Sequence, residues 1–167
     1  MHFDLKPIKM QSIPEALAKV ERYRLLNEPR LAESICLDIL RVSPGNKEAL
    51  IALLLARTDQ FGGEGTAARA QEVLAQIKGE YEHAYYEGLI WERIGHARLR
   101  QGRPGSGATA YQALRTAMAQ YEKAEGFSPP GNDDAILRWN TCARVIMQNP
   151  EIRPIVEDER VQPITGE

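Results

Sequence analysis

Two proline-containing breaks divide residues 14–55 into three stretches with helical periodicity, and this alternation constrains the fold more than any other feature. The breaks are an Asn-Glu-Pro sequence at 27–29 and a Pro-Gly-Asn sequence at 44–46. Between them, apolar residues recur three to four positions apart, which places them on one helical face. Such short one-sided helices bury that face only against neighbours. We therefore expect two antiparallel helices followed by a third.

The same signals continue along the chain and predict seven helices, of which three pairs form hairpins and the last is unpaired. The expected helices lie at about 13–27, 29–43, 46–60, 66–79 and 108–126, with one around Trp91 and a last one at about 133–148. An extended lead-in at 1–12 precedes the helical domain at 13–148, and a tail follows at 149–167. Ser12 and Glu15 have the spacing of a capping box, and Asn46 is a favoured helix cap.

The spacing of Tyr23, Ala32 and Pro44, nine and twelve residues apart, resembles the tetratricopeptide repeat (TPR) family. That family is built from 34-residue helix–turn–helix units that stack into a solenoid. The resemblance covers about 13–148. It implies an all-α, TPR-like superhelix.

A second match to the TPR signature is the pattern Trp91-x-x-Ile94-Gly95, followed by Gly102 at a turn. A small residue at Gly95 lets the two helices of a hairpin approach closely. The chain departs from the family pattern at Arg98, where an aromatic residue is expected. We predict that a large side chain at position 95 destabilises the hairpin.

The resemblance implies a non-catalytic module for protein–protein interaction, which binds a peptide or partner protein in a concave groove. The first helix of each pair lines that groove. The implied partner-binding residues are Glu21, Arg24, Leu55, Asp59, Glu92, His96, Arg100, Asn140 and Arg144, with Arg93 beside them. Leu17 and Glu21 stand where chaperone-binding members place a Lys and an Asn, so a chaperone-type carboxylate clamp is disfavoured.

Charge patterning indicates what kind of partner the groove would take. From Arg93 to Arg115 the chain carries five arginines and no acidic residue. Arg93 and Arg100 are seven apart and share a helical face, and the solenoid would bring Arg144 close to them. Convergent arginines favour a carboxylate-rich or phosphorylated peptide. A solvated basic patch without a ligand is the alternative, and a single aromatic residue in the stretch makes RNA a weaker third choice.

Catalytic and metal-binding patterns are incomplete. Glu80-x-x-His83 is one half of a di-iron ligand pattern, and Glu92 with His96 is expected to be an exposed pair on one helix. Neither glycine-rich loop has the ending of a phosphate-binding loop. We therefore expect no enzymatic activity, no cofactor and no metal. The two cysteines are expected to be buried thiols rather than a disulfide.

The formal net charge of −2 gives no global attraction to nucleic acid or membrane. The N-terminus lacks the apolar core of a signal peptide, and no stretch is apolar enough for a transmembrane helix. We expect a cytoplasmic protein. Two other functions stay open: a self-assembling protein that forms a homodimer through the helix at 133–148, and an accessory subunit of an enzyme encoded elsewhere. The apolar face of that helix should be covered, either by residues 152–164 folding back or by a second chain.

Overall fold

The computed structural model describes residues 1–62 and 67–154, and their regular structure is helical. A short 3-10 helix at Met10–Ser12 precedes the first α-helix. The α-helices are α1 (Ile13–Leu25), α2 (Pro29–Val42), α3 (Lys47–Thr58), α4 (Ala67–Leu74), α5 (Glu80–Gln101), α6 (Ser106–Glu125) and α7 (Asp134–Gln148). The all-α prediction is confirmed, and the helix positions agree with those expected from the sequence except at the end of α4.

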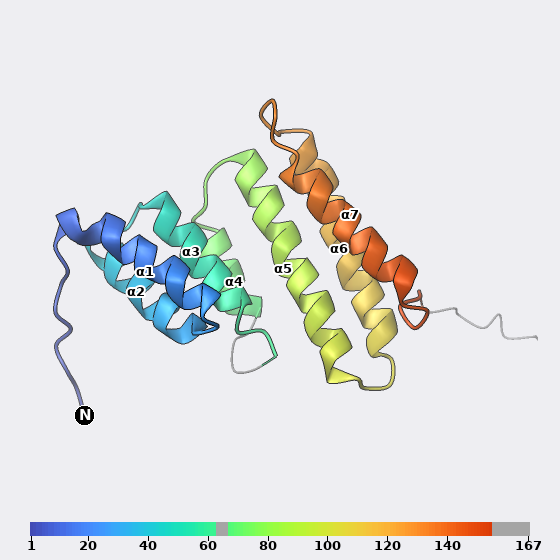
Figure 1. Cartoon of the computed structure of the whole chain (residues 1–167), viewed down its shortest axis with the longest axis horizontal. Helices are drawn as coiled ribbons and strands as arrows, with labels where there is room; N and C mark the ends of the chain where they lie inside the picture. The colour runs from blue at the N-terminus through green and yellow to red at the C-terminus, as the bar shows by residue number, and fades with distance from the viewer. Residues whose placement is uncertain (63–66, 155–167) are drawn as a thin grey trace, which may run out of the picture.

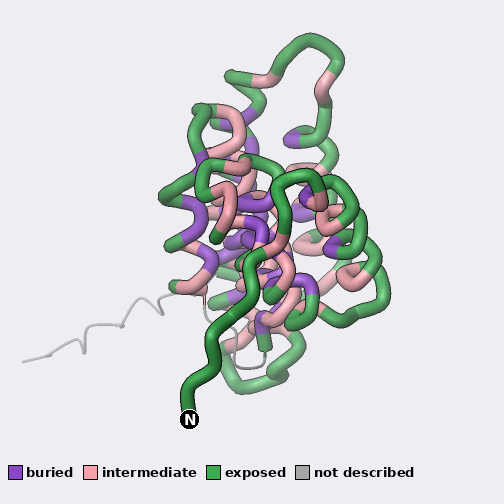
Figure 2. Tube along the Cα trace, turned by 90° about the vertical axis from the view of Figure 1, so that its left-hand side faces the viewer, coloured by how far each residue is buried: buried purple, intermediate pink, exposed green. Residues whose placement is uncertain are grey.

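Each helix packs against the next one in the chain, and α1 also contacts α3. The four helices α1 to α4 form one end of an elongated molecule, α5 crosses its middle, and α6 and α7 form the other end (Figure 1). The residues before Met10 run along the outside as an extended segment that is exposed except at Ile8, which packs against the helices (Figure 2). Its position is held in part by the Arg41 guanidinium, which donates to the Leu5 carbonyl over 2.8 Å.

The interior is divided into two hydrophobic clusters that meet on α5. The first cluster contains residues from the four helices α1 to α4 and from one side of α5. On that side of α5, Leu89 and Ile90 are almost fully buried. The second joins α6 and α7 with the opposite side of α5, which contributes Ala84. A helix that buries residues on two sides stands between two layers rather than on a surface. The position of α5 therefore determines how the two ends of the molecule meet.

Two glycines let α5 approach α6 closely. A Cβ atom at Gly95 would lie 2.9 Å from the Leu114 Cγ, and one at Gly88 would lie 2.8 Å from the Tyr121 Cε1. Both distances are shorter than normal carbon contacts. The facing surface of α6 is also lined with small residues, because Ala110 and Ala117 are fully buried there. Gly95 thus occupies the helix crossing that the sequence pattern indicated, and Gly88 is a second such position.

Three local predictions have different outcomes. Asn46 caps α3 as expected, since its Oδ1 accepts a hydrogen bond from the Ala49 N–H over 2.9 Å. The capping box at Ser12 is wrong: the Ser12 side chain makes no capping hydrogen bond, because the backbone already turns in the preceding 3-10 helix. The helix expected to reach residue 79 ends at Leu74, and the backbone turns through Gly79 at a φ of 104°.

The inner face of α7 is covered mainly by α6. Cys142 lies on this face of α7 and is fully buried. The Trp139 indole donates to the Glu122 carboxylate of α6 over 2.8 Å. Beyond α7, Ile152 folds back and is only 3% exposed. Of the segment expected to cover this face, Ile152 is buried in the cluster that contains Cys142, residues 153–154 are exposed, and residues 155–164 lie outside the described residues.

Candidate functional site

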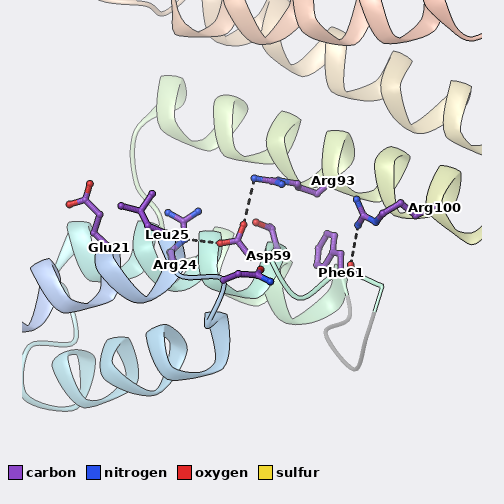
Figure 3. Close-up of a pocket in the computed structure, with 9 residues that line it drawn as sticks. Glu21, Arg24, Leu25, Asp59, Phe61, Arg93 and Arg100 are labelled. Atoms are coloured by element: carbon purple, nitrogen blue, oxygen red, sulfur yellow. Dashed lines mark hydrogen bonds and ion pairs between the residues drawn. The ribbon is translucent and has the colours of Figure 1, made fainter.

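A cavity of about 610 Å³ lies between α1, the end of α3 and α5 (Figure 3). Its walls come from parts of the chain that are far apart in sequence. The lining residues are Glu21, Arg24, Leu25, Asn27, Thr58, Asp59, Phe61, Arg93 and Arg100. Three arginines converge on this space from two helices.

Helix geometry accounts for the placement of the charged groups. Glu21 and Arg24 are three residues apart on α1, and Arg93 and Arg100 are seven apart on α5, so each pair shares one face of its helix. Asp59 is the C-cap residue that follows α3, and its backbone N–H donates to the Leu55 carbonyl over 2.9 Å. The carboxylate is thereby held between the two helices that carry the arginines.

Asp59 bridges α1 and α5. The Arg24 Nε donates to one carboxylate oxygen over 2.8 Å, and an Arg93 terminal nitrogen lies 3.5 Å from the other oxygen. Figure 3 shows the two guanidinium groups reaching the carboxylate from different helices. The Asp59 side chain is 19% exposed, so these ion pairs are less screened by water than pairs on an open surface.

The arginines keep unused hydrogen-bonding capacity. Arg100 donates to the Phe61 carbonyl over 3.2 Å and has no carboxylate partner among the described residues. The Nε of Arg93 is buried without a hydrogen-bond partner in the described part of the chain. A guanidinium has five N–H donors. Three arginines and two carboxylates, those of Asp59 and Glu21, line the cavity. Its wall therefore carries a net charge of +1.

An apolar groove of about 200 Å³ adjoins the cavity between α1 and α3. The two spaces share Glu21 and Arg24 in their walls. The other residues lining the groove are Leu17, Val20, Glu48, Ile51, Ala52 and Leu55. Glu48 lines only the groove, whereas Glu21 and Arg24 line both spaces, so the surface changes from apolar in the groove to cationic in the cavity.

The structure brings together half of the residues that the sequence nominated for a partner-binding groove. The five that line the cavity are Glu21, Arg24, Asp59, Arg93 and Arg100, and Leu55 lines the adjoining groove. Asn140 and Arg144 lie on α7 and line neither space, and Arg144 is exposed. Phe61 was missed because it stands in a loop, where helical spacing gives no information on its direction.

Glu92 and His96 belong to a different environment, and the expected exposed Glu–His pair is wrong. Glu92 is only 3% exposed, because it faces α6 and α7 rather than solvent. The Tyr121 hydroxyl donates to its Oε2 over 2.6 Å, and Arg138 donates to its Oε1 over 3.1 Å. The His96 Nε2 lies 3.8 Å from Oε1. Glu92 therefore joins three helices and is not available to a ligand in the cavity.

Burial controls the pKa values of this cluster. It raises the pKa of Tyr121 far above the ordinary value, and the nearby Glu92 carboxylate adds to the effect. It lowers the pKa of His96, against the opposing effect of Glu92. Tyr121 is therefore a neutral hydrogen-bond donor at neutral pH, which is the form that stabilises a buried carboxylate.

The described residues contain no group of three or more His, Cys, Asp or Glu side chains suited to holding a metal ion. Glu80 and His83 lie at the start of α5, where His83 is near Glu87. Cys36 and Cys142 are both free and buried, and burial raises the pKa of each thiol to about 12. Such thiols are poor nucleophiles at neutral pH. Within the described part of the chain, no helix is long and apolar enough to cross a membrane.

Comparisons of this chain with protein-family models, with curated proteins and with solved structures gave no match.

Proposed function

We propose that this protein is a non-catalytic binding module in which a TPR-like array of helix pairs holds an acidic segment of a partner protein. The observation that carries the proposal is the convergence of Arg24, Arg93 and Arg100 on one cavity. Arginines bind carboxylates through paired N–H donors, and they do so most strongly where water is partly excluded. A carboxylate-rich peptide matches both the excess positive charge and the elongated shape of this surface.

The adjoining groove adds an apolar requirement. Leu17, Ile51 and Leu55 offer a surface for one apolar side chain of the bound segment, and Glu48 disfavours further acidic residues at that end. The preferred ligand is then an apolar residue followed by acidic residues, in the direction that leads from the α1–α3 groove toward α5. Burial of an apolar side chain supplies affinity, and the charges supply orientation.

Selection from a random peptide library tests this function without a known partner. Displayed 12-residue peptides are selected on the wild-type protein and, in parallel, on an Arg93→Glu, Arg100→Glu double variant. A matched control carries the same charge change at Arg115 and Arg144, which are exposed and do not line the cavity. We expect acidic peptides to be enriched on the wild type and on the control.

The enriched peptides should bind the cavity variant at least about tenfold more weakly, which is 1.4 kcal/mol, and salt should weaken their binding to the wild type. A further peptide series that varies the spacing between a single Leu and a Glu-Glu-Glu segment should show one preferred spacing. Failure to enrich acidic peptides, or equal binding to wild type and cavity variant, contradicts the proposed function.

Self-association is a second candidate, and it is favoured by the outer face of α7. Leu137 is 61% exposed and Met147 is 75% exposed on this helix. Exposed apolar patches on soluble proteins often mark interaction surfaces. Light scattering on the wild type and on a Leu137→Glu, Met147→Glu variant distinguishes the two functions: a dimer that becomes a monomer in the variant supports self-association, and a monomeric wild type excludes it.

A further inference from the structure

Asp59 already occupies the position in which a ligand carboxylate would bind. Its two oxygens face Arg24 and Arg93, at 2.8 Å and 3.5 Å. Two of the three cavity arginines therefore have an anionic partner before any ligand arrives. An incoming carboxylate competes with this internal group for the same N–H donors, whereas Arg100 donates to the Phe61 carbonyl and has no carboxylate partner within residues 1–62 and 67–154.

The competition depends on how many charges the ligand carries. With Asp59 ionised, the three arginines and the two carboxylates leave a net charge of +1 on the wall. A ligand with a single carboxylate gains mainly the pairing with Arg100. A ligand with several adjacent carboxylates can pair with Arg100 and also take over donors of Arg93 and Arg24. Its attraction grows with each added charge, while the cost of displacing Asp59 is incurred once.

Asp59 also holds the two sides of the cavity together. Arg24 belongs to α1 and Arg93 to α5, and their like charges repel unless an anion lies between them. When the internal carboxylate is lost, a ligand carboxylate can take its place as the bridge. A protein that lacks this carboxylate should therefore be less stable when free, and it should gain more stability from simple anions.

We infer that Asp59 sets the charge selectivity of the cavity, by acting as an internal counter-ion that disfavours single carboxylates and favours ligands with several adjacent ones. This inference rests on the proposed function, since it concerns which anionic segments the same cavity accepts. A cluster of acidic residues, rather than one acidic side chain, is then the feature of the partner that the cavity recognises.

The test compares acetate with tricarballylate, a small molecule that carries three carboxylates, at constant ionic strength. Thermal unfolding is followed for the wild type, for Asp59→Asn and for Asp133→Asn, a matched charge change at an exposed position outside the cavity. In the wild type and in the control, tricarballylate should raise Tm far more than acetate does at the same concentration. In Asp59→Asn, acetate should raise Tm more than it does in the wild type, and the ratio of the tricarballylate affinity to the acetate affinity should fall about tenfold. A fall of less than threefold overturns the inference.

An NMR measurement on the wild type keeps the inference testable if Asp59→Asn does not fold. The Nε–H signal of Arg24 reports the hydrogen bond to Asp59. Tricarballylate should shift this signal as it displaces Asp59, and acetate should leave it unchanged. If tricarballylate binds without shifting the signal, or if both anions shift it equally, Asp59 does not set the selectivity.

The outcomes separate this inference from the proposed function. If wild type and Asp59→Asn prefer tricarballylate over acetate to the same extent, only the role assigned to Asp59 is wrong. The cavity then still accounts for peptides whose binding depends on the arginines. If neither protein binds tricarballylate, the inference fails. The proposed function fails with it only if the peptide selection also yields no arginine-dependent binder.

Discussion

Substitution of Gly95 by leucine tests how α5 and α6 are held together. The Cβ atom alone would lie 2.9 Å from the Leu114 Cγ, 3.1 Å from its Cδ2 and 3.5 Å from the Ala110 carbonyl oxygen. Leu114 is fully buried, and Ala110 presents backbone rather than a flexible side chain. Neither neighbour can move aside locally. The added side chain must therefore push the two helices apart.

The expected cost follows from three contributions. Overpacking a well-packed contact costs about 1–3 kcal/mol. Separation of the helices also exposes part of the Leu114 side chain, whose complete burial contributes about 1.5–3 kcal/mol. The higher helix propensity of leucine offsets these costs by a little under about 1 kcal/mol. We expect Gly95→Leu to lower the free energy of unfolding by about 2–4 kcal/mol.

Thermal and urea unfolding measure this change. For a chain of this size, 2–4 kcal/mol corresponds to a fall in Tm of roughly 5–15 °C. Gly45→Leu is the matched control, because a Cβ atom at Gly45 would meet no atom within 4 Å, and its effect should stay within about 0.5 kcal/mol. If Gly95→Leu leaves Tm within a degree or two of the wild type, Gly95 does not lie at a close crossing and the packing argument is refuted.

Three further changes test the second cluster and the buried thiols. Tyr121→Phe removes the hydroxyl that donates to the buried Glu92 carboxylate and should cost about 1.5–3 kcal/mol in urea unfolding; a cost under about 0.5 kcal/mol would contradict the buried bond. Ile152→Ala should destabilise the protein by about 2–4 kcal/mol, because Ile152 is 3% exposed, whereas an unchanged Tm would mean that it does not cover α7. Cys36 and Cys142 should react with a disulfide reagent at pH 8 only after unfolding, since burial raises the pKa of each thiol to about 12; rapid reaction of the folded protein would show that the thiols are accessible.

Local signals in the sequence were sufficient to predict the helices. Proline and glycine mark the breaks in a way that depends on backbone chemistry alone, so the positions of α1, α2 and α3 could be predicted closely. The end of α4 could not, because Ile77 continues the apolar rhythm beyond the helix and is itself buried. A side chain can reach the core from a turn as well as from a helix, and periodicity does not distinguish the two.

The cavity arginines were found because Arg93 and Arg100 lie on one helix, where spacing determines direction. The environment of Glu92 could not be found in this way. Its partners Tyr121 and Arg138 are 29 and 46 residues away in the chain, and no local pattern indicates such contacts. Gly88 does carry a local signal, because it lies seven residues before Gly95 and both glycines therefore face α6.

The expectation that Arg144 would join Arg93 and Arg100 depended on the helices repeating regularly through α7. Instead, Arg138 of α7 reaches α5 by donating to Glu92, on a side of α5 that does not face the cavity. The cationic surface therefore lies between α1, α3 and α5. Placement of one helix relative to another depends on side-chain packing at their contact, which spacing within a single helix does not determine.

The most direct test of the central claim locates a bound peptide on the molecule. A peptide obtained from the library selection carries a nitroxide spin label at one end or the other, and the loss of backbone amide NMR signals is mapped. With the label at the acidic end, we predict loss of signals around Asp59 and from Arg93 to Arg100. With the label at the apolar end, signals around Leu17 and Ile51 should be lost. Signal loss confined to α7, or an identical pattern for the two labels, would contradict binding in the arginine-lined cavity and the orientation proposed for the ligand.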